Sequence, residues 1–347
     1  MRYKFVPDNP EEEKALESNP SALPLFDPFL PPLQARSIMA GVRLGIFKAI
    51  GYGAHTAEQL AQTLSLDPEA LELLLRVLSC AGYVARHGDQ YQLTELTRNT
   101  LLPESRFQLT EWMEYNYIQW KIIERLEEVL KTGKGIGVRE SIGEPENWEI
   151  HQQAMLETAR PAAPLVASLV PIKDGAKKML DIGGSHGLYG AMICRKHPPM
   201  RSEVLELPEA VEYARKLAQG EGIDDVVSHR ACDVMRDDLG KGYDAVFLGS
   251  INHHFTPDQN MELLQRIKKA LTKNGTVAIW EFKRPDPDSE PDLVGDGLAL
   301  FFRITSAAQC YTSADYIGWI KSAGFIEVKV HPTPFSPSQI LVSGRVP

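Results

Sequence analysis

The segment DIGGSHG, residues 181–187, places an acid and three closely spaced glycines directly after a short apolar run. Gly183, Gly184 and Gly187 would let a ligand approach the backbone closely. Their G-G-x-x-G spacing differs from the G-x-G-x-x-G spacing of dinucleotide-binding loops. The carboxylate of Asp181 would repel a pyrophosphate but would attract cationic groups. The segment therefore predicts a binding loop for a positively charged ligand rather than for a nicotinamide dinucleotide.

Two more acids follow later apolar runs, and parallel sheets bind their ligands at the carboxyl ends of such strands. Glu206 has the usual position of an acid that accepts hydrogen bonds from both ribose hydroxyls. Asp233 is placed to accept the adenine amino group, with Val234 beside it as an apolar wall. Together with Asp181 they favour S-adenosylmethionine, whose amino and sulfonium groups are cationic. The position of Glu206 alone suits either S-adenosylmethionine or a nicotinamide dinucleotide. The alternative for all three acids is that they belong to ordinary strand-to-helix turns and bind no ligand.

These residues need a sheet to bring them together, and the second half of the sequence predicts one. Short β-rich runs alternate with helical segments, which is typical of a doubly wound, mostly parallel sheet. After the fifth run come a helix near 313–323 and two extended runs that would pair as a terminal antiparallel hairpin. The seven predicted strands are KKMLDIGG, SEVLELP, DVVSHRACD, YDAVFLGS, TVAIWEF, FIEVKVHP and QILVSGR.

The first hundred residues predict a mainly α-helical winged-helix domain. Residues 25–50 form an apolar helical stretch with more apolar side chains than one face can hold. Thr56 and Gln59 have the spacing of a capping box, and Asp67 with Pro68 opens a further helix. The run YVARHGDQYQLTE then alternates as two short strands around a turn. Helix, helix and two-stranded wing follow in that order.

Winged helices often bind DNA, but this one carries few cations. Its second helix has Arg76 against Glu69 and Glu72, and the whole chain has a formal net charge of −9. Binding in a DNA groove needs several lysines or arginines. We therefore expect no nucleic-acid partner, and we expect the apolar first helix to serve in pairing two copies of the chain as a homodimer.

Helices with an aromatic face connect the two halves. Trp112, Tyr115, Asn116 and Trp120 lie at helical spacing, and they either pack the joint between domains or contact a substrate. In a later helix, His151 and Met155 share a face at i,i+4, where they line a pocket or serve as ordinary interdomain residues. We predict a winged-helix domain over 1–105, a helical bridge over 106–165 and a cofactor-binding domain over 166–347.

The length and composition of the chain indicate how many domains it has and which kinds of site and location to expect. A chain of 347 residues with 43% apolar residues is long enough for two domains. The four cysteines are far apart and show no C-x-x-C spacing, which predicts neither a metal site nor a disulfide framework. The opening residues lack an apolar signal core, and no later run is long enough for a membrane span. We expect a cytoplasmic protein without a membrane partner.

On these motifs the sequence resembles the small-molecule O-methyltransferases of the caffeate and acetylserotonin type, and their bacterial relatives, over nearly its whole length. The family's D-x-G-G-G-x-G loop matches residues 181–187, with Ser185 in place of one glycine. Its D-L-P motif is ELP at 206–208, and its G-D-x-F motif is CDVM at 232–235. The resemblance implies a Rossmann-like class I methyltransferase domain after a winged-helix dimerisation domain. The expected cofactor residues are Asp181, Gly183, Gly184, Gly187, Glu206, Leu207, Asp233, Val234 and Gly249.

The resemblance also implies a catalytic pair. The family's I-L-H-D-W segment corresponds to INHHF at 251–255, which puts His253 at the position of the general base, and Glu281 falls on the acid that orients it. A phenol has a pKa of about 10 and a histidine one of about 6.5, so a histidine can assist removal of the phenolic proton during methyl transfer. Alternatively, His254 is the base, or both histidines merely cap the helix that begins near Pro257.

Three departures from the family pattern concern the acceptor and the cofactor. Gly249 stands where relatives often carry a lysine, Cys310 and Tyr311 stand where plant members have a glutamate beside an arginine, and His-Asp has become His-His. We predict O-methylation of a small aromatic or polyketide-like molecule, with transfer to nitrogen or carbon left open. A relative with non-methylating chemistry, a regulator and a dehydrogenase are the alternatives. The expected acceptor-binding residues are Trp112, Asn116, Trp120, His151, Met155, His254, Phe302 and Cys310.

Overall fold

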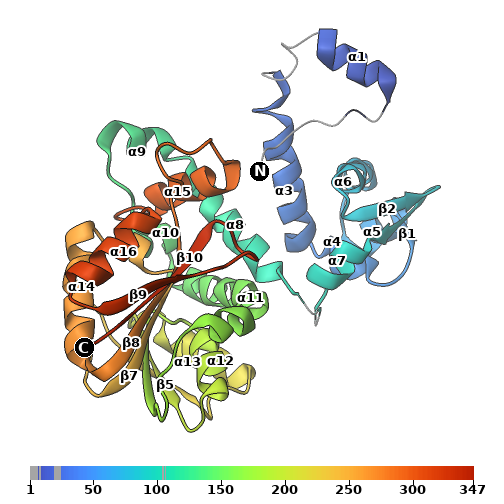
Figure 1. Cartoon of the computed structure of the whole chain (residues 1–347). Helices are drawn as coiled ribbons and strands as arrows, with labels where there is room; N and C mark the ends of the chain where they lie inside the picture. The colour runs from blue at the N-terminus through green and yellow to red at the C-terminus, as the bar shows by residue number, and fades with distance from the viewer. Residues whose placement is uncertain (1–6, 8, 19–24, 104, 106) are drawn as a thin grey trace. The chain divides into compact units, whose positions relative to one another are not determined.

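The computed structural model describes residues 7, 9–18, 25–103, 105 and 107–347, and it divides the chain into two compact units (Figure 1). The N-terminal unit ends at Tyr117 and the C-terminal unit begins at Ile118. Residues 1–6 and 8 of the opening segment, for which we expect no signal core, lie outside the described residues. No helix in the described part of the chain is long and apolar enough to cross a membrane. The same residues contain no group of three or more histidine, cysteine or acidic side chains that could hold a metal ion.

The N-terminal unit is mainly helical and contains a three-stranded sheet of order β1-β3-β2. Its elements are α1 (Pro10–Ser18), α3 (Leu30–Arg43), α4 (Ile46–Ile50), β1 (His55–Thr56), α5 (Ala57–Leu64), α6 (Pro68–Cys80), β2 (Val84–His87), β3 (Gln90–Leu93), α7 (Glu95–Thr100) and the first part of α8 (Thr110–Ile123). The helices and the two-stranded wing occur in the predicted order.

Local sequence signals set the helix boundaries in this unit. The Thr56 side chain accepts from the Gln59 N–H while the Gln59 side chain accepts from the Thr56 N–H, so the predicted capping box is confirmed. Asp67 caps α6 by accepting from the Ala70 N–H at 2.8 Å. The single helix expected over 25–50 is wrong, because Gly45 has φ of 70° and separates α3 from α4. A left-handed residue of this kind ends a helix, and glycine adopts it without steric cost.

The C-terminal unit holds a seven-stranded sheet of order β6-β5-β4-β7-β8-β10-β9. The strands are β4 (Lys178–Ile182), β5 (Arg201–Glu206), β6 (Val227–Ala231), β7 (Tyr243–Gly249), β8 (Leu271–Phe282), β9 (Ile326–His331) and β10 (Gln339–Arg345). All neighbouring pairs are parallel except those of β10, which runs antiparallel to both β8 and β9. The seven predicted strands and the terminal hairpin are therefore confirmed.

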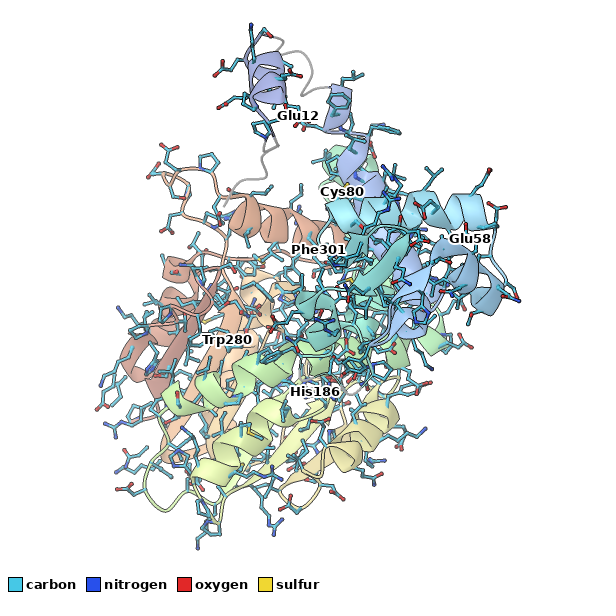
Figure 2. The ribbon with its side chains drawn as sticks, turned by 90° about the vertical axis from the view of Figure 1, so that its right-hand side faces the viewer. Glu12, Glu58, Cys80, His186, Trp280 and Phe301 are labelled. Atoms are coloured by element: carbon cyan, nitrogen blue, oxygen red, sulfur yellow. The ribbon has the colours of Figure 1, made fainter. Side chains whose placement is uncertain are left out.

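Helices cover both faces of this sheet (Figure 1). The helical elements of this unit after α8 are α9 (Leu126–Thr132), α10 (Val138–Ile142), α11 (Pro145–Leu169), α12 (Leu188–Lys196), α13 (Val211–Gly220), the 3-10 turn η1 (Asn252–His254), α14 (Pro257–Ala270), α15 (Leu293–Thr305) and α16 (Ser313–Ser322). On one face, Leu180 of β4 packs in a core cluster with residues of α14 and α16. On the other, its neighbour Met179 packs with residues of α11 and α12. Trp280 of β8, which is fully buried in that second cluster, lies in the interior (Figure 2).

The strand order reverses its direction beside β4. From β4 the chain builds outward through β5 and β6 on one side and through β7 and β8 on the other. The carboxyl edge at such a switch point is where doubly wound sheets bind ligands. The loop 183–187 begins at this point, because it connects β4 to α12.

Candidate functional site

The glycines of the loop meet both backbone and packing requirements. Gly183 and Gly187 have φ values of 62° and 77°, a region that L side chains rarely adopt. A Cβ atom at Gly183 would overlap the Ile251 side chain, and one at Gly184 would overlap the Asp181 carboxylate. We expected the glycines to admit a ligand. The structure adds a second reason, because the loop folds tightly onto its own protein neighbours.

The Asp181 carboxylate lies beneath the loop and is only 1% exposed. It fits between Gly184 and Gly190, where added side chains would collide with it. The pKa of Asp181 is raised to about 7, chiefly by burial and also by the charge of Glu206, while the nearby Gly190 amide lowers it. Because no ion pair to Asp181 is found within the described ranges, its negative charge has no cationic protein partner there.

Glu206 is fixed at the end of β5 by backbone donors. Its Oε2 accepts from the Ser185 N–H at 3.0 Å, and its Oε1 accepts from the Leu207 N–H at 2.7 Å. The side chain is 7% exposed, and burial raises its pKa to about 7 although these two N–H groups lower it. Glu206 therefore faces the loop in one orientation, with Leu207 directly after it.

Asp233 and Val234 follow β6 and have different surroundings. Asp233 lies 3.6 Å from Arg139 Nη2, and Arg139 Nε also donates to Glu209 Oε1 at 2.9 Å. The Asp233 Oδ1 atom accepts from the Met235 N–H at 3.1 Å. Val234 is 7% exposed and belongs to the core cluster on the α14 side of the sheet. Asp233 thus has a cationic protein neighbour, which distinguishes it from Asp181 and Glu206.

His253 and Glu281 lie next to each other because β7 and β8 are parallel neighbours, with Gly249 paired to Trp280. His253 Nδ1 is 2.9 Å from Glu281 Oε1, and the two side chains are 3% and 0% exposed. The same carboxylate accepts from the Asn252 N–H at 2.7 Å and from the Phe282 N–H at 2.8 Å. When Nδ1 donates to this carboxylate, the neutral ring keeps its lone pair on Nε2.

The histidines do not cap the following helix. Thr256 is the N-cap of α14, where it forms a capping box with Gln259. The capping alternative for His253 and His254 is therefore wrong. Instead, Asn260 of α14 holds the turn, because its side chain donates to the Phe255 carbonyl and accepts from the Asn252 side chain.

Aromatic and neutral polar side chains surround His253. The His254 and Phe302 rings have centroids 4.2 and 3.9 Å from the His253 ring. His254 Nδ1 lies 3.0 Å from Ser306 Oγ. Burial, and then the neighbouring His253 and His151, hold the pKa of His254 well below its usual value. Burial also lowers the pKa of His151 to about 4, so both imidazoles are neutral at physiological pH.

The other predicted acceptor residues are divided between the units. Cys310 is 1% exposed, and burial and then the charge of Glu281 raise the pKa of its thiol. Met155 lies one turn after His151 on α11, and Trp120 belongs to the part of α8 in the C-terminal unit. Trp112 and Asn116 belong to the N-terminal unit, where Asn116 Nδ2 donates to the Trp112 carbonyl at 2.7 Å. A role of Trp112 and Asn116 in binding therefore stays a prediction.

Gly249 ends β7 and is followed by Ser250, which has φ of 53°. A Cβ at Gly249 would lie 2.9 Å from the Phe247 ring, so the position favours a residue without a side chain. A lysine at this point would also have to fit against that ring.

Sequence reasoning missed several polar residues in and next to the loop. Gln152 of α11 accepts from Ser185 in the loop, and His186 in the loop hydrogen-bonds to the backbone of α11. Arg139 lies next to Asp233. Their partners lie far away along the chain, so spacing gave no signal. Only Ser185 was visible, as a serine at a position where the family has glycine.

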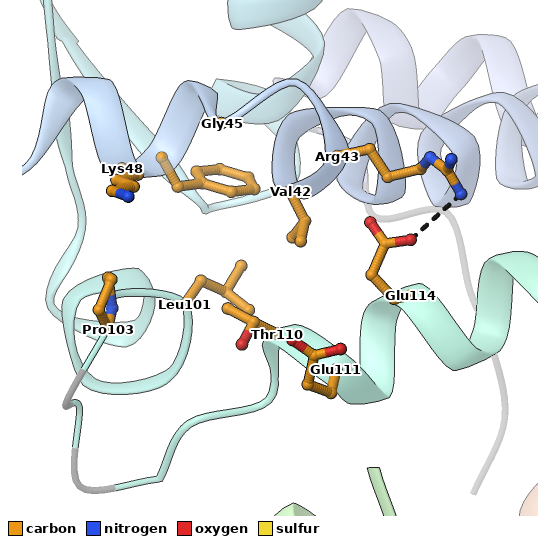
Figure 3. Close-up of a pocket in the computed structure, with 10 residues that line it drawn as sticks. Val42, Arg43, Gly45, Lys48, Leu101, Pro103, Thr110, Glu111 and Glu114 are labelled. Carbon is orange, nitrogen blue, oxygen red and sulfur yellow. Dashed lines mark hydrogen bonds and ion pairs between the residues drawn. The ribbon is translucent and has the colours of Figure 1, made fainter. Parts of the chain in front are cut away.

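The N-terminal unit has a pocket of about 260 Å³ (Figure 3). It is lined by residues of α3, α4 and α8, and Arg43 Nη1 pairs with Glu114 Oε2 across it at 3.1 Å. None of the predicted catalytic or cofactor residues lines it. The chemistry of the loop and of the histidine pair belongs to the C-terminal unit.

Comparison with known families agrees with this division. The O-methyltransferase domain family matches residues 117–326, and the O-methyltransferase dimerisation domain matches residues 35–103. The chain belongs to the O-methyltransferase family and carries its dimerisation domain. Since the first match includes the glycine-rich loop, the dehydrogenase alternative is not retained.

The chain is similar to several named members of this family. It is 25% identical over 305 residues to 3-hydroxy-5-methyl-1-naphthoate 3-O-methyltransferase of Streptomyces sahachiroi, covering 85% of this chain and 87% of that protein. It is 26% identical over 268 residues to the mitomycin biosynthesis 6-O-methyltransferase of Streptomyces lavendulae, covering 71% and 73%. The fold matches human N-acetylserotonin methyltransferase in complex with SAM, with a TM-score of 0.78, 18% identity and 99% of both chains covered.

Proposed function

We propose that this protein transfers a methyl group from S-adenosylmethionine to a hydroxyl group of a small aromatic or polyketide-like molecule. The named relatives act on such compounds, and family membership supports the same class of reaction. The observation that carries the proposal is the buried hydrogen bond of 2.9 Å between His253 Nδ1 and Glu281 Oε1 at the carboxyl edge of the sheet.

The residues around the loop fit this cofactor. Both carboxylate oxygens of Asp181 are buried without a hydrogen-bond partner among the described residues, and Glu206 is a buried acid that accepts from backbone amides. A cationic ligand would compensate for their charge. Asp181, Gly183, Gly184 and Gly187 would form the cradle, Glu206 with Leu207 would hold the ribose, and Asp233 with Val234 the adenine, while Gly249 would lie beside the methionine part. S-adenosylmethionine, when bound, supplies an electrophilic methyl group on a sulfonium.

His253 would act as the general base. Its Nε2 lone pair can take the proton of the acceptor hydroxyl, which makes the oxygen a better nucleophile. Glu281 fixes the ring in the tautomer that has this lone pair, and its charge stabilises the imidazolium that forms. Neutral His254 and His151, with Met155, Phe302, Cys310 and Trp120 of the same unit, would form an apolar acceptor pocket with few charges.

Two measurements test this function. Calorimetry with S-adenosylhomocysteine should register binding, whereas NAD should give no heat.

Turnover should be followed as S-adenosylhomocysteine formation with a panel of hydroxynaphthoates and polyketide-like phenols. His253→Ala should lower turnover by about a hundredfold or more, and His87→Ala on the wing should leave it unchanged. Full turnover in His253→Ala would remove this residue from the mechanism.

We also propose that the chain is a homodimer through its N-terminal unit. The match to the dimerisation domain supports this, and Leu25, Phe29 and Leu33 are 68%, 61% and 47% exposed in the single chain. Sedimentation should give the mass of two chains, and Leu33→Glu should shift it toward one. The division into three parts at 105 and 165 stays a prediction.

A further inference from the structure

Helix α11 contacts the cofactor loop through two side-chain hydrogen bonds. Ser185 Oγ donates to Gln152 Oε1 at 2.5 Å, and Gln152 is only 1% exposed. His186 accepts from the Leu188 N–H at its Nδ1 atom (3.0 Å) and hydrogen-bonds to the backbone of Met155. Burial lowers the pKa of His186 to about 3, so its ring is neutral. Because Nδ1 accepts a hydrogen bond, the single ring proton lies on Nε2, which faces α11. His186 is buried in the interior of its unit (Figure 2).

Ser185 is held at all three of its polar groups. Its N–H donates to Glu206 Oε2 at 3.0 Å, its carbonyl accepts from His229 Nε2 at 3.0 Å, and its hydroxyl donates to Gln152. Its φ of 51° lies in the left-handed region, which costs energy for a residue with a side chain. Surrounding contacts must compensate for that cost. The bond to Gln152 is one of them, and a glycine at this position could not make it.

We propose that Gln152 is a positioning residue for the cofactor site, which it acts on through Ser185. By fixing the Ser185 hydroxyl, Gln152 holds the Ser185 N–H against the Glu206 carboxylate, and so sets the orientation in which that carboxylate meets the ribose. The same helix carries His151 and Met155, which we assign to the acceptor pocket, so α11 links the two substrates' sites. This inference rests on the proposed function for the identity of its ligand.

A double-mutant cycle tests the contact. Ser185→Ala and Gln152→Leu should each weaken the binding of S-adenosylhomocysteine by about two- to tenfold, the range of one net hydrogen bond. The double variant should bind no more weakly than either single variant, because both remove the same bond. Ser168→Ala removes a matched serine hydroxyl at the far end of α11, where it donates to the Leu165 carbonyl, and should bind like the parent.

A separate readout does not depend on the ligand. In the free protein, amide hydrogen exchange over 183–188 should be faster in Gln152→Leu than in the parent, with the sheet strands unchanged. Ser185→Gly serves where Ser185→Ala folds poorly, since glycine accepts the left-handed conformation. If the parent gives no heat with S-adenosylhomocysteine, the proposed function fails. The exchange data would still test whether Gln152 holds Ser185 in place, because they are measured without the ligand. Unchanged exchange, or fully multiplicative losses in the double variant, would overturn the role of Gln152.

Discussion

The two sides of the sheet's carboxyl edge use buried carboxylates in different ways. On the side of β4 and β5, Glu206 accepts from two backbone amides, whereas neither carboxylate oxygen of Asp181 has a hydrogen-bond partner among the described residues. Burial raises the pKa of each acid to about 7. On the side of β7 and β8, Glu281 has the same kind of backbone donors but also the His253 ring. The side of His253 and Glu281 is thus paired within the protein, and we call it the complete side. The side of Asp181 and Glu206 has no cationic partner for these two acids among the described residues, and we call it the incomplete side.

The largest loss of turnover and of stability should come from a substitution on the complete side, in the His253–Glu281 pair. Glu281→Gln presents an amide nitrogen to donors that need an acceptor, so both folding and catalysis should suffer. We expect turnover to fall by about a hundredfold or more, and the free energy of unfolding to drop by about 3 kcal/mol, measured in urea. Glu262→Gln changes an exposed acid on α14 and should alter neither. A stable, active Glu281→Gln protein would contradict the role assigned to the pair.

A smaller change in stability and in ligand affinity should come from titrating the two acids of the incomplete side, Asp181 and Glu206. Between about pH 4 and 7 the folded protein holds protons on Asp181 and Glu206 that the unfolded chain has released, so stability of the free protein should fall as pH rises through this window. A ligand that donates hydrogen bonds to ionised Glu206 should bind with proton release. The affinity for S-adenosylhomocysteine should therefore rise up to about tenfold from pH 6 to 8.

Calorimetry at pH 6, 7 and 8, in buffers of different ionisation enthalpy, measures both the affinity and the protons released. Glu206→Gln cannot titrate and should bind more weakly, with a flatter pH profile. Equal affinities across this range, or proton uptake instead of release, would show that these acids are already ionised in the free protein.

The smallest effect concerns Asp233, an acid on the incomplete side that differs from Asp181 and Glu206 because it has a cationic neighbour, Arg139. Arg139 and Glu209 are roughly half exposed, and exposed pairs contribute less than about 1 kcal/mol. Arg139→Ala should lower the free energy of unfolding by no more than that and change the affinity for S-adenosylhomocysteine by less than about fivefold. Arg236→Ala, which removes a more exposed neighbour of Asp233, is the matched control. A larger loss in Arg139→Ala would mean that Arg139 contacts the ligand itself.

Local signals in the sequence were sufficient for most of the fold. Apolar runs predicted the seven strands, and the capping-box spacing identified Thr56 as the N-cap of α5. These signals were insufficient where tertiary packing determines where a helix begins and ends. Gly45 interrupts the first apolar helix, and α11 continues through two prolines, Pro161 and Pro164, to Leu169. A proline removes one hydrogen bond from a helix, but packing against the sheet can outweigh that loss.

The candidate site was predictable only in part. The loop acids follow from strand-end positions, and the pairing of His253 with Glu281 came from family resemblance. The bond between Ser185 and Gln152 joins residues 33 apart and exists only because α11 packs on α12. No periodicity or motif encodes that contact, so the sequence could show an unusual serine without showing its partner.

The antiparallel insertion of β10 determines when the site can form. Ile340 of β10 pairs with Glu281, so the strand that carries the acid is sandwiched between β7 and a partner encoded almost sixty residues later. During synthesis the ribosome must release β10 before β8 gains its second neighbour. A nascent chain stopped ahead of Gln339 could fold the cofactor loop yet would leave the acid strand at a bare sheet edge.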